Sequence, residues 1–218
     1  MGAYITLGAA MLLLPGIYWV VMELYRPHFW KEENRKRVSL TTMPEYLVLL
    51  AGEAALVRVW WNLGKCNAAD MRFQMLFIML IGMTVFCMTD YREQVVPNRL
   101  LLLLLLLYFI ILGLQGIRDM GKVLEAFPSI VLGLLFCMIS FGLGYLLSRG
   151  SMGAGDVKLS FVMGLYLTGE YVVGAVFYGC VAGAAFAVVQ LLRRKLSRKD
   201  TIPFVPFLYL GLIIRYLI

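Results

Sequence analysis

The sequence predicts an all-α protein, a polytopic bundle of seven or eight transmembrane helices. Of the 218 residues, 61% are hydrophobic and only 15% are charged, whereas soluble domains average about 45–50% apolar and about 25% charged residues. The apolar residues also gather in runs that approach the length of about 20 residues that a helix needs to cross a bilayer. We therefore expect residues 1–218 to form a single integral-membrane domain.

Eight apolar runs are separated by short polar segments. The sixth run has only about twelve residues, so it forms either a half-span or a span that tilts with its neighbour, and seven and eight spans both stay open. The runs cover Tyr4–Leu24, Pro44–Leu63, Phe73–Thr89, Leu100–Gly116, Pro128–Leu147, Val157–Thr168, Tyr171–Leu192 and Ile202–Leu217.

Residues at the ends of some runs support these assignments. The first run is too long for a cleavable signal and lies too far from a small-residue cleavage site, so we expect a retained span. Asn98 is expected to cap the fourth helix, after Pro97 has closed the preceding loop.

Glu53 lies near the middle of the second run, where an ionisable group is costly. It is either a substrate or proton contact or a hydrogen-bonded packing residue.

The basic residues predict the orientation. Fourteen of the twenty Lys and Arg residues fall in the loops after the first, third, fifth and seventh runs. Lys and Arg concentrate in cytoplasmic loops of membrane proteins. We therefore expect a protein of the cell membrane with its N-terminus outside, and its basic loops in contact with lipid head groups.

Several classes of site are disfavoured by composition. The chain has four cysteines, no two of them spaced as C-x-x-C, and one histidine, His28. A metal or haem site built from Cys and His is therefore not expected, and no cofactor is implied. The net charge of +7 does not indicate nucleic-acid binding, because the loops lack both length and interleaved aromatic residues.

Two aspartates lie where apolar runs meet cytoplasmic loops. Asp90 ends the third run and Asp156 precedes the sixth, with 65 residues between them. The parity of the spans places both at one depth on one face of the membrane. Each has a structural alternative when taken singly: Asp156 as the N-cap of the sixth helix, and Asp90 as an interfacial charge paired with Arg92.

Two carboxyl groups that share one proton can hydrolyse a peptide. The ionised group takes a proton from water while the protonated group donates to the scissile carbonyl. Gly153 and Gly155 flank this chemistry in the sequence Gly-Ala-Gly-Asp, where glycine permits a tight turn and close approach of a substrate strand. Lys158 either favours the ionised form or anchors the helix at the interface.

Three motifs resemble those of type IV prepilin peptidases. Asp156 lies in Gly-Ala-Gly-Asp-Val-Lys-Leu, which resembles the G-x-G-D signature of membrane aspartyl proteases. Asp90 with Pro97 and Asn98 resembles the D-x6-P-N element of that family. Pro203, Phe204 and Pro206 lie in a stretch similar to P-F-x-P-F-L, although residue 205 is Val where glycine is common.

The resemblance implies a function and a site. The family removes the leader of prepilins and related precursors at the cytoplasmic membrane face, cutting after a glycine that precedes a hydrophobic helix. Asp90 and Asp156 would be catalytic, and residues 73–218 would form the peptidase core, with two accessory spans in residues 1–72. Larger members carry a cytoplasmic insert with C-x-x-C pairs that methylates the product. The first loop here has no cysteine, so we expect a peptidase without methyltransferase activity.

Two alternatives stay open. A presenilin-like intramembrane protease would also use two aspartates, although that type has a Tyr-Asp pair deep in a helix, and here Asp90 precedes Tyr91. A small transporter or assembly scaffold would use the acids as proton or cation sites. Transporters usually carry an internal repeat, which the sequence does not contain.

Overall fold

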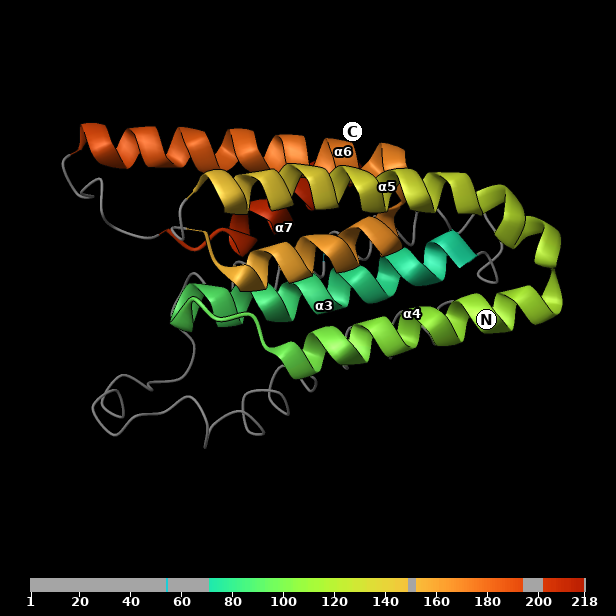
Figure 1. The fold of residues 1–218 in the computed structure, drawn as a ribbon. Helices are drawn as coiled ribbons and strands as arrows, with labels where there is room; N and C mark the ends of the chain where they lie inside the picture. Colours follow the sequence, from blue (N-terminus) through green and yellow to red (C-terminus); the bar gives the residue numbers. More distant parts are fainter. Residues whose placement is uncertain (1–53, 55–70, 149–151, 194–201, 218) are drawn as a thin grey trace. The chain divides into compact units, whose positions relative to one another are not determined.

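The computed structural model describes residue 54 and residues 71–148, 152–193 and 202–217. The chain divides into two units, Met1–Ala68 and Ala69–Ile218, and the helices described here belong to the second. They are α3 (Met71–Glu93), α4 (Asn98–Arg118), α5 (Met120–Leu147), α6 (Ala154–Leu192) and α7 (Val205–Leu217) (Figure 1). The predicted all-α class is confirmed over these ranges, while Glu53 and the first two predicted spans lie outside them.

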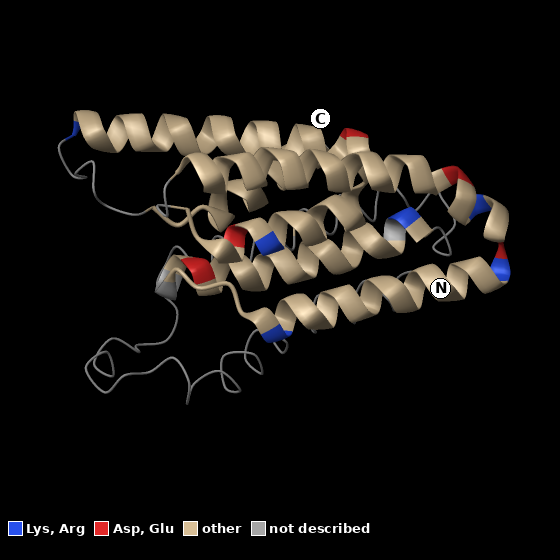
Figure 2. Cartoon of the chain, in the orientation of Figure 1, with Lys and Arg blue, Asp and Glu red and all other residues tan. Residues whose placement is uncertain are grey.

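By length and composition, four of these helices can cross a membrane: α3, α4, α5 and α6. Figure 2 shows that the charged residues of the described helices gather toward the two ends of the bundle, with a long stretch between them that carries none. A bilayer imposes this distribution, because charged side chains are costly within the hydrocarbon. The α7 helix is also apolar but shorter.

The α3 helix forms the centre of the unit. Of its apolar stretch, 67% is buried inside the protein, compared with 22% for each of α4, α5 and α6. Met75, Met79, Met83 and Phe86 are buried along it, at the spacing of three and four residues that places side chains on one helical face. The outer helices instead expose many large apolar side chains, as expected of surfaces that contact lipid.

The α6 helix is interrupted at Thr168, where φ is 57° and ψ is 162°. This backbone conformation is one that residues other than glycine rarely adopt. Figure 1 shows that the chain reverses its direction at this point. The two parts, 154–167 and 169–192, coincide closely with the sixth and seventh apolar runs of the sequence. The first part is about 20 Å long at 1.5 Å per residue and packs inside the bundle, with Leu159 and Met163 fully buried.

The fifth helix extends beyond the apolar run that begins at Pro128. The helix α5 begins at Met120, and Pro128 lies inside it. The cause is a cap: the Asp119 Oδ1 atom accepts a hydrogen bond from the backbone N–H of Lys122 at 3.3 Å. Such a cap satisfies one of the N–H groups that a helix start leaves unpaired.

Glycines bring pairs of helices into backbone contact. A Cβ atom on Gly164 of α6 would lie 2.8 Å from the carbonyl oxygen of Gly133 on α5. A Cβ atom on Gly179, farther along α6, would lie 2.9 Å from the carbonyl oxygen of Phe207 on α7. Small residues allow such close approach of membrane helices and so increase their van der Waals contact.

Replacing Gly164 by alanine should destabilise the protein by about 1–3 kcal/mol, the usual cost of overpacking. The new methyl group would meet backbone atoms of α5, which cannot rotate away. Thermal unfolding of the purified protein in detergent micelles measures the effect. Gly113→Ala is the matched control, because a Cβ atom there meets nothing within 4 Å. Equal unfolding temperatures for Gly164→Ala and Gly113→Ala would contradict the close approach.

Candidate active site

Asp90 lies in the last turns of α3 and is only 4% exposed. Its Oδ2 atom accepts a hydrogen bond from the backbone N–H of Val205 at 3.0 Å. Val205 is the first residue of α7, and the first N–H groups of a helix have no partner within it. The carboxylate of Asp90 therefore caps α7 and lies at the positive end of its dipole. One turn and a half earlier on α3, the Thr84 hydroxyl hydrogen-bonds the Tyr209 hydroxyl at 3.0 Å, which adds a second polar tie between α3 and α7.

The third motif is held in place by this cap and by an aromatic contact. The ring of Phe204 packs against Phe141 of α5, with 5.9 Å between ring centroids. Pro206 is the second residue of α7, where a missing N–H removes no intrahelical hydrogen bond. Val205 is not among the residues with positive φ. A side chain is therefore accommodated there, and the departure from glycine carries no backbone strain.

Asp156 lies in the first turn of α6 and is half-buried. The alternative that it caps this helix is wrong, because Gly153 occupies the N-cap position. The backbone N–H of Asp156 donates to the carbonyl oxygen of Gly153 at 3.1 Å, which forms the first turn. The carboxylate is thus close to the positive end of α6, which favours a negative charge.

The two aspartates line one cavity of about 410 Å³, and their negative charges repel each other there. Pro97 and Pro206 do not line this cavity, whereas the other site residues expected from the sequence do. Those residues are Asp90, Asn98, Gly153, Gly155, Asp156, Lys158, Pro203 and Phe204. Within the described ranges, no three His, Cys, Asp or Glu side chains meet in a group that could hold a metal ion.

Gly155 acts through close packing rather than through a turn. A Cβ atom on Gly155 would lie 3.0 Å from the Cβ atom of Val96, so its lack of a side chain lets the start of α6 approach the loop before α4. Gly153 has a φ of −68°, and the hydrogen bond from the Asp156 N–H to its carbonyl oxygen closes a tight turn at this point. Val96 fills the space that a side chain on Gly155 would occupy, while Gly155 itself lines the cavity.

Lys158 and Asn98 join the two acidic motifs across the cavity. The Lys158 Nζ atom donates to the Asn98 Oδ1 atom at 3.1 Å. The expectation that Asn98 caps α4 is therefore wrong: Pro97 occupies the N-cap position, and no side chain caps this helix. The side chain of Asn98 is directed to the partner motif 60 residues away in sequence.

The sequence reasoning missed three contributors to the site. Val96 fills the space beside Gly155, and Val205 supplies a backbone N–H to Asp90. Gln94 lines the cavity with a positive φ of 54°, and its N–H donates to the carbonyl oxygen of Asp90 at 2.9 Å. A left-handed residue with this hydrogen bond is a common way to end a helix. Such a helix end is usually marked in a sequence by glycine, and residue 94 is glutamine. The backbone N–H of Val205 has no sequence signature, because almost every residue has one.

A double-mutant cycle should detect the Lys158–Asn98 hydrogen bond. With Asn98→Ala and Lys158→Met, we expect a coupling free energy of unfolding of about 0.5–1 kcal/mol, because the donor is charged but both side chains are exposed. Chemical unfolding in micelles measures it. The control cycle pairs Asn98→Ala with Lys122→Met, since Lys122 interacts with Asp119 beyond the far end of α4. Equal coupling in the two cycles would refute the contact.

Comparisons with known proteins agree with the motifs. Over 133 residues, the chain is 26% identical to a prepilin leader peptidase/N-methyltransferase of Bacillus subtilis (strain 168). The aligned region covers 61% of this chain and 51% of that protein, so the chain spans about half the length of the curated relative it matches. None of the solved structures matches significantly. The profile of the type IV leader peptidase family matches residues 77–188, a range that is more than half of the chain and contains both Asp90 and Asp156, and the protein therefore belongs to this family.

Proposed function

We propose that the protein is an aspartyl endopeptidase that removes the leader peptide of prepilin-like precursors. The observation that supports this most is that Asp90 and Asp156, from different helices, line one cavity and interact electrostatically. Membership of a leader peptidase family favours peptide hydrolysis over transport or a scaffold role. Residues 73–218 would form the peptidase core.

The reaction needs one carboxylate and one carboxylic acid. In this mechanism a water molecule between the two groups gives a proton to the carboxylate as its oxygen attacks the scissile carbonyl carbon. The carboxylic acid donates its proton to the carbonyl oxygen. Collapse of the tetrahedral intermediate then breaks the C–N bond, and the leaving amine takes a proton from the pair. Two carboxyl groups that line one cavity and repel each other when both are ionised favour a singly protonated pair.

The site would open at the cytoplasmic face of the cell membrane. Asp90 and Asp156 border two of the four loops that follow odd-numbered spans in the sequence. Together these four loops carry most of the Lys and Arg residues, as cytoplasmic loops do. The substrate would be cut after a glycine that precedes an apolar helix. A scissile bond at this position lies at the membrane surface, at the depth where helices α3 and α6 carry their carboxyl groups.

Asp90→Asn and Asp156→Asn should each reduce cleavage of a co-expressed prepilin by at least about 10²-fold, because each removes a proton-transfer group. Asparagine keeps an oxygen that can accept from the Val205 N–H, so Asp90→Asn should still fold. Asp90→Leu is the contrasting variant: it leaves that buried N–H unpaired, at a cost of about 1–3 kcal/mol. Immunoblotting for the shortened precursor reports cleavage, and thermal unfolding reports stability. Processing that survives in either asparagine variant would falsify the assignment.

We also propose that the product is not methylated by this chain, because the first predicted cytoplasmic loop has no cysteine pair. The processed precursor should carry a free, unmodified N-terminal amine when S-adenosylmethionine is supplied. Mass spectrometry of the new N-terminus tests this, with a methylating family member as the positive control. A methylated terminus that depends on the present chain contradicts the proposal.

A further inference from the structure

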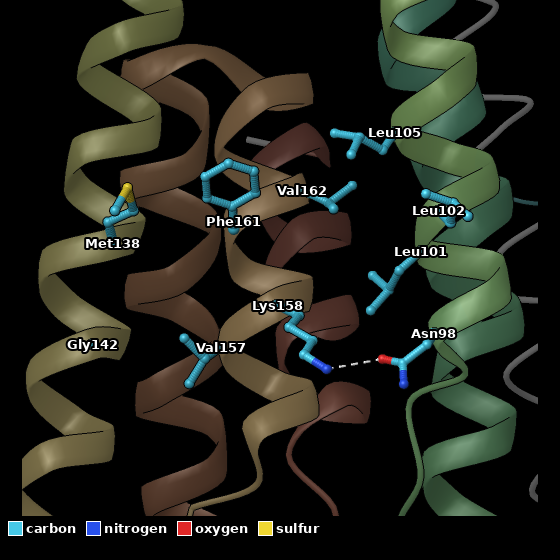
Figure 3. Close-up of a pocket in the computed structure, with 10 residues that line it drawn as sticks. All are labelled: Asn98, Leu101, Leu102, Leu105, Met138, Gly142, Val157, Lys158, Phe161 and Val162. Carbon is cyan, nitrogen blue, oxygen red and sulfur yellow. Dashed lines mark hydrogen bonds between the residues drawn. The ribbon is translucent and has the colours of Figure 1, made fainter.

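A second hollow of about 500 Å³ lies between α4, α5 and the first part of α6. Figure 3 shows side chains from all three helices directed into it. On α4, Asn98, Leu101, Leu102 and Leu105 line the hollow. Their spacing of three, four and seven residues places them on one face of the helix. This groove therefore follows α4 for two helical turns, about 10 Å.

The groove adjoins the cavity that holds the aspartates, and the two hollows share lining residues. Asn98 and Lys158 line both hollows, and their hydrogen bond lies at the boundary (Figure 3). Asp156 lines the cavity, and its neighbour Val157 lines the groove. The two hollows therefore meet at the Lys158–Asn98 pair, next to Asp156.

The two hollows differ in chemistry. Apart from Asn98 and Lys158, the groove is lined only by apolar side chains and by Gly142 of α5. A Cβ atom on Gly142 would meet nothing within 4 Å, so that side of the groove is open. The three helices that form it are long and apolar enough to cross a membrane. The occupant that fits both hollows is polar beside the carboxylates and apolar over the next two turns within the bilayer.

We propose that this groove binds the apolar segment that directly follows the scissile bond of the precursor. The inference rests on the proposed peptidase function and adds a subsite to it. The cut bond lies in the cavity between Asp90 and Asp156, the chain crosses beside Lys158, and the apolar side chains that follow pack against Leu102 and Leu105 of α4 and Phe161 of α6. In the groove, the apolar segment of the precursor replaces lipid and packs against these side chains. This contact positions the scissile bond at the two aspartates.

Gly142→Leu tests the subsite, because its side chain enters the groove without meeting protein atoms. In the full-length protein in proteoliposomes, we expect KM for a membrane-embedded precursor to rise about tenfold, because the added side chain occupies the groove and removes packing contacts of the precursor, while kcat stays close to wild type. Gly113→Leu on α4 is the matched control, since its added side chain also meets nothing within 4 Å. It should cleave with wild-type KM.

Site-specific photo-cross-linking provides a measurement that does not depend on Gly142→Leu folding. In the Asp156→Asn protein, a photoreactive residue at Leu102 should capture the precursor through its apolar segment. The same residue at Leu103, which is exposed but about 100° around the helix from Leu102, should capture lipid instead. Unchanged KM for a folded Gly142→Leu protein overturns the inference. So does a Leu102 cross-link only to lipid, or only to residues 1–70 of the same chain. If the wild-type protein cleaves no precursor at all, the proposed function itself has failed.

Discussion

The site depends on one buried hydrogen bond, from the N–H of Val205 to the carboxylate of Asp90. It joins the most buried helix of the unit, α3, to the start of α7 across 115 residues of sequence. A buried carboxylate without a partner is costly, and so is a buried helix start whose N–H groups are unpaired. The hydrogen bond gives a partner both to the carboxylate and to the N–H group, and so lowers the free-energy cost of burying each. The same contact places Pro203 and Phe204 in the cavity wall. The third motif therefore holds the carboxylate of Asp90 in position and supplies no reactive group of its own.

The second acid reaches the cavity by a different route. Asp156 is carried by the inner part of α6, whose start packs on the loop before α4 through Gly155 and Val96. Lys158 completes this arrangement by bonding to Asn98 on α4. The two aspartates therefore approach each other because two separate interfaces, α3 with α7 and α6 with the α3–α4 loop, close on the same space.

Much of this was predictable from the sequence. The apolar runs predicted the helices, and the reversal at Thr168 separates the short sixth run from the full-length seventh run. The parity of the runs brought Asp90 and Asp156 to one end, because helix topology is set by the number of crossings. The errors share a cause: they concern backbone groups and side-chain partners. Asn98 was expected to serve its own helix, and instead binds Lys158. The fifth apolar run begins at Pro128, whereas a cap at Asp119 begins the helix earlier. The donor from Val205 could not be anticipated, since every residue except proline has an N–H.

The reversal at Thr168 also affects how the protein responds to its lipid environment. Membrane helices usually tilt or shift when the bilayer thickens or thins, because their apolar length must match the hydrocarbon. The part of α6 that carries Asp156 is only about 20 Å long, and most of its apolar side chains are buried against other helices. Its depth is consequently fixed by protein packing. A cell that alters its fatty-acid composition with temperature would thus keep the spacing of the two acids constant while the outer helices adjust around them.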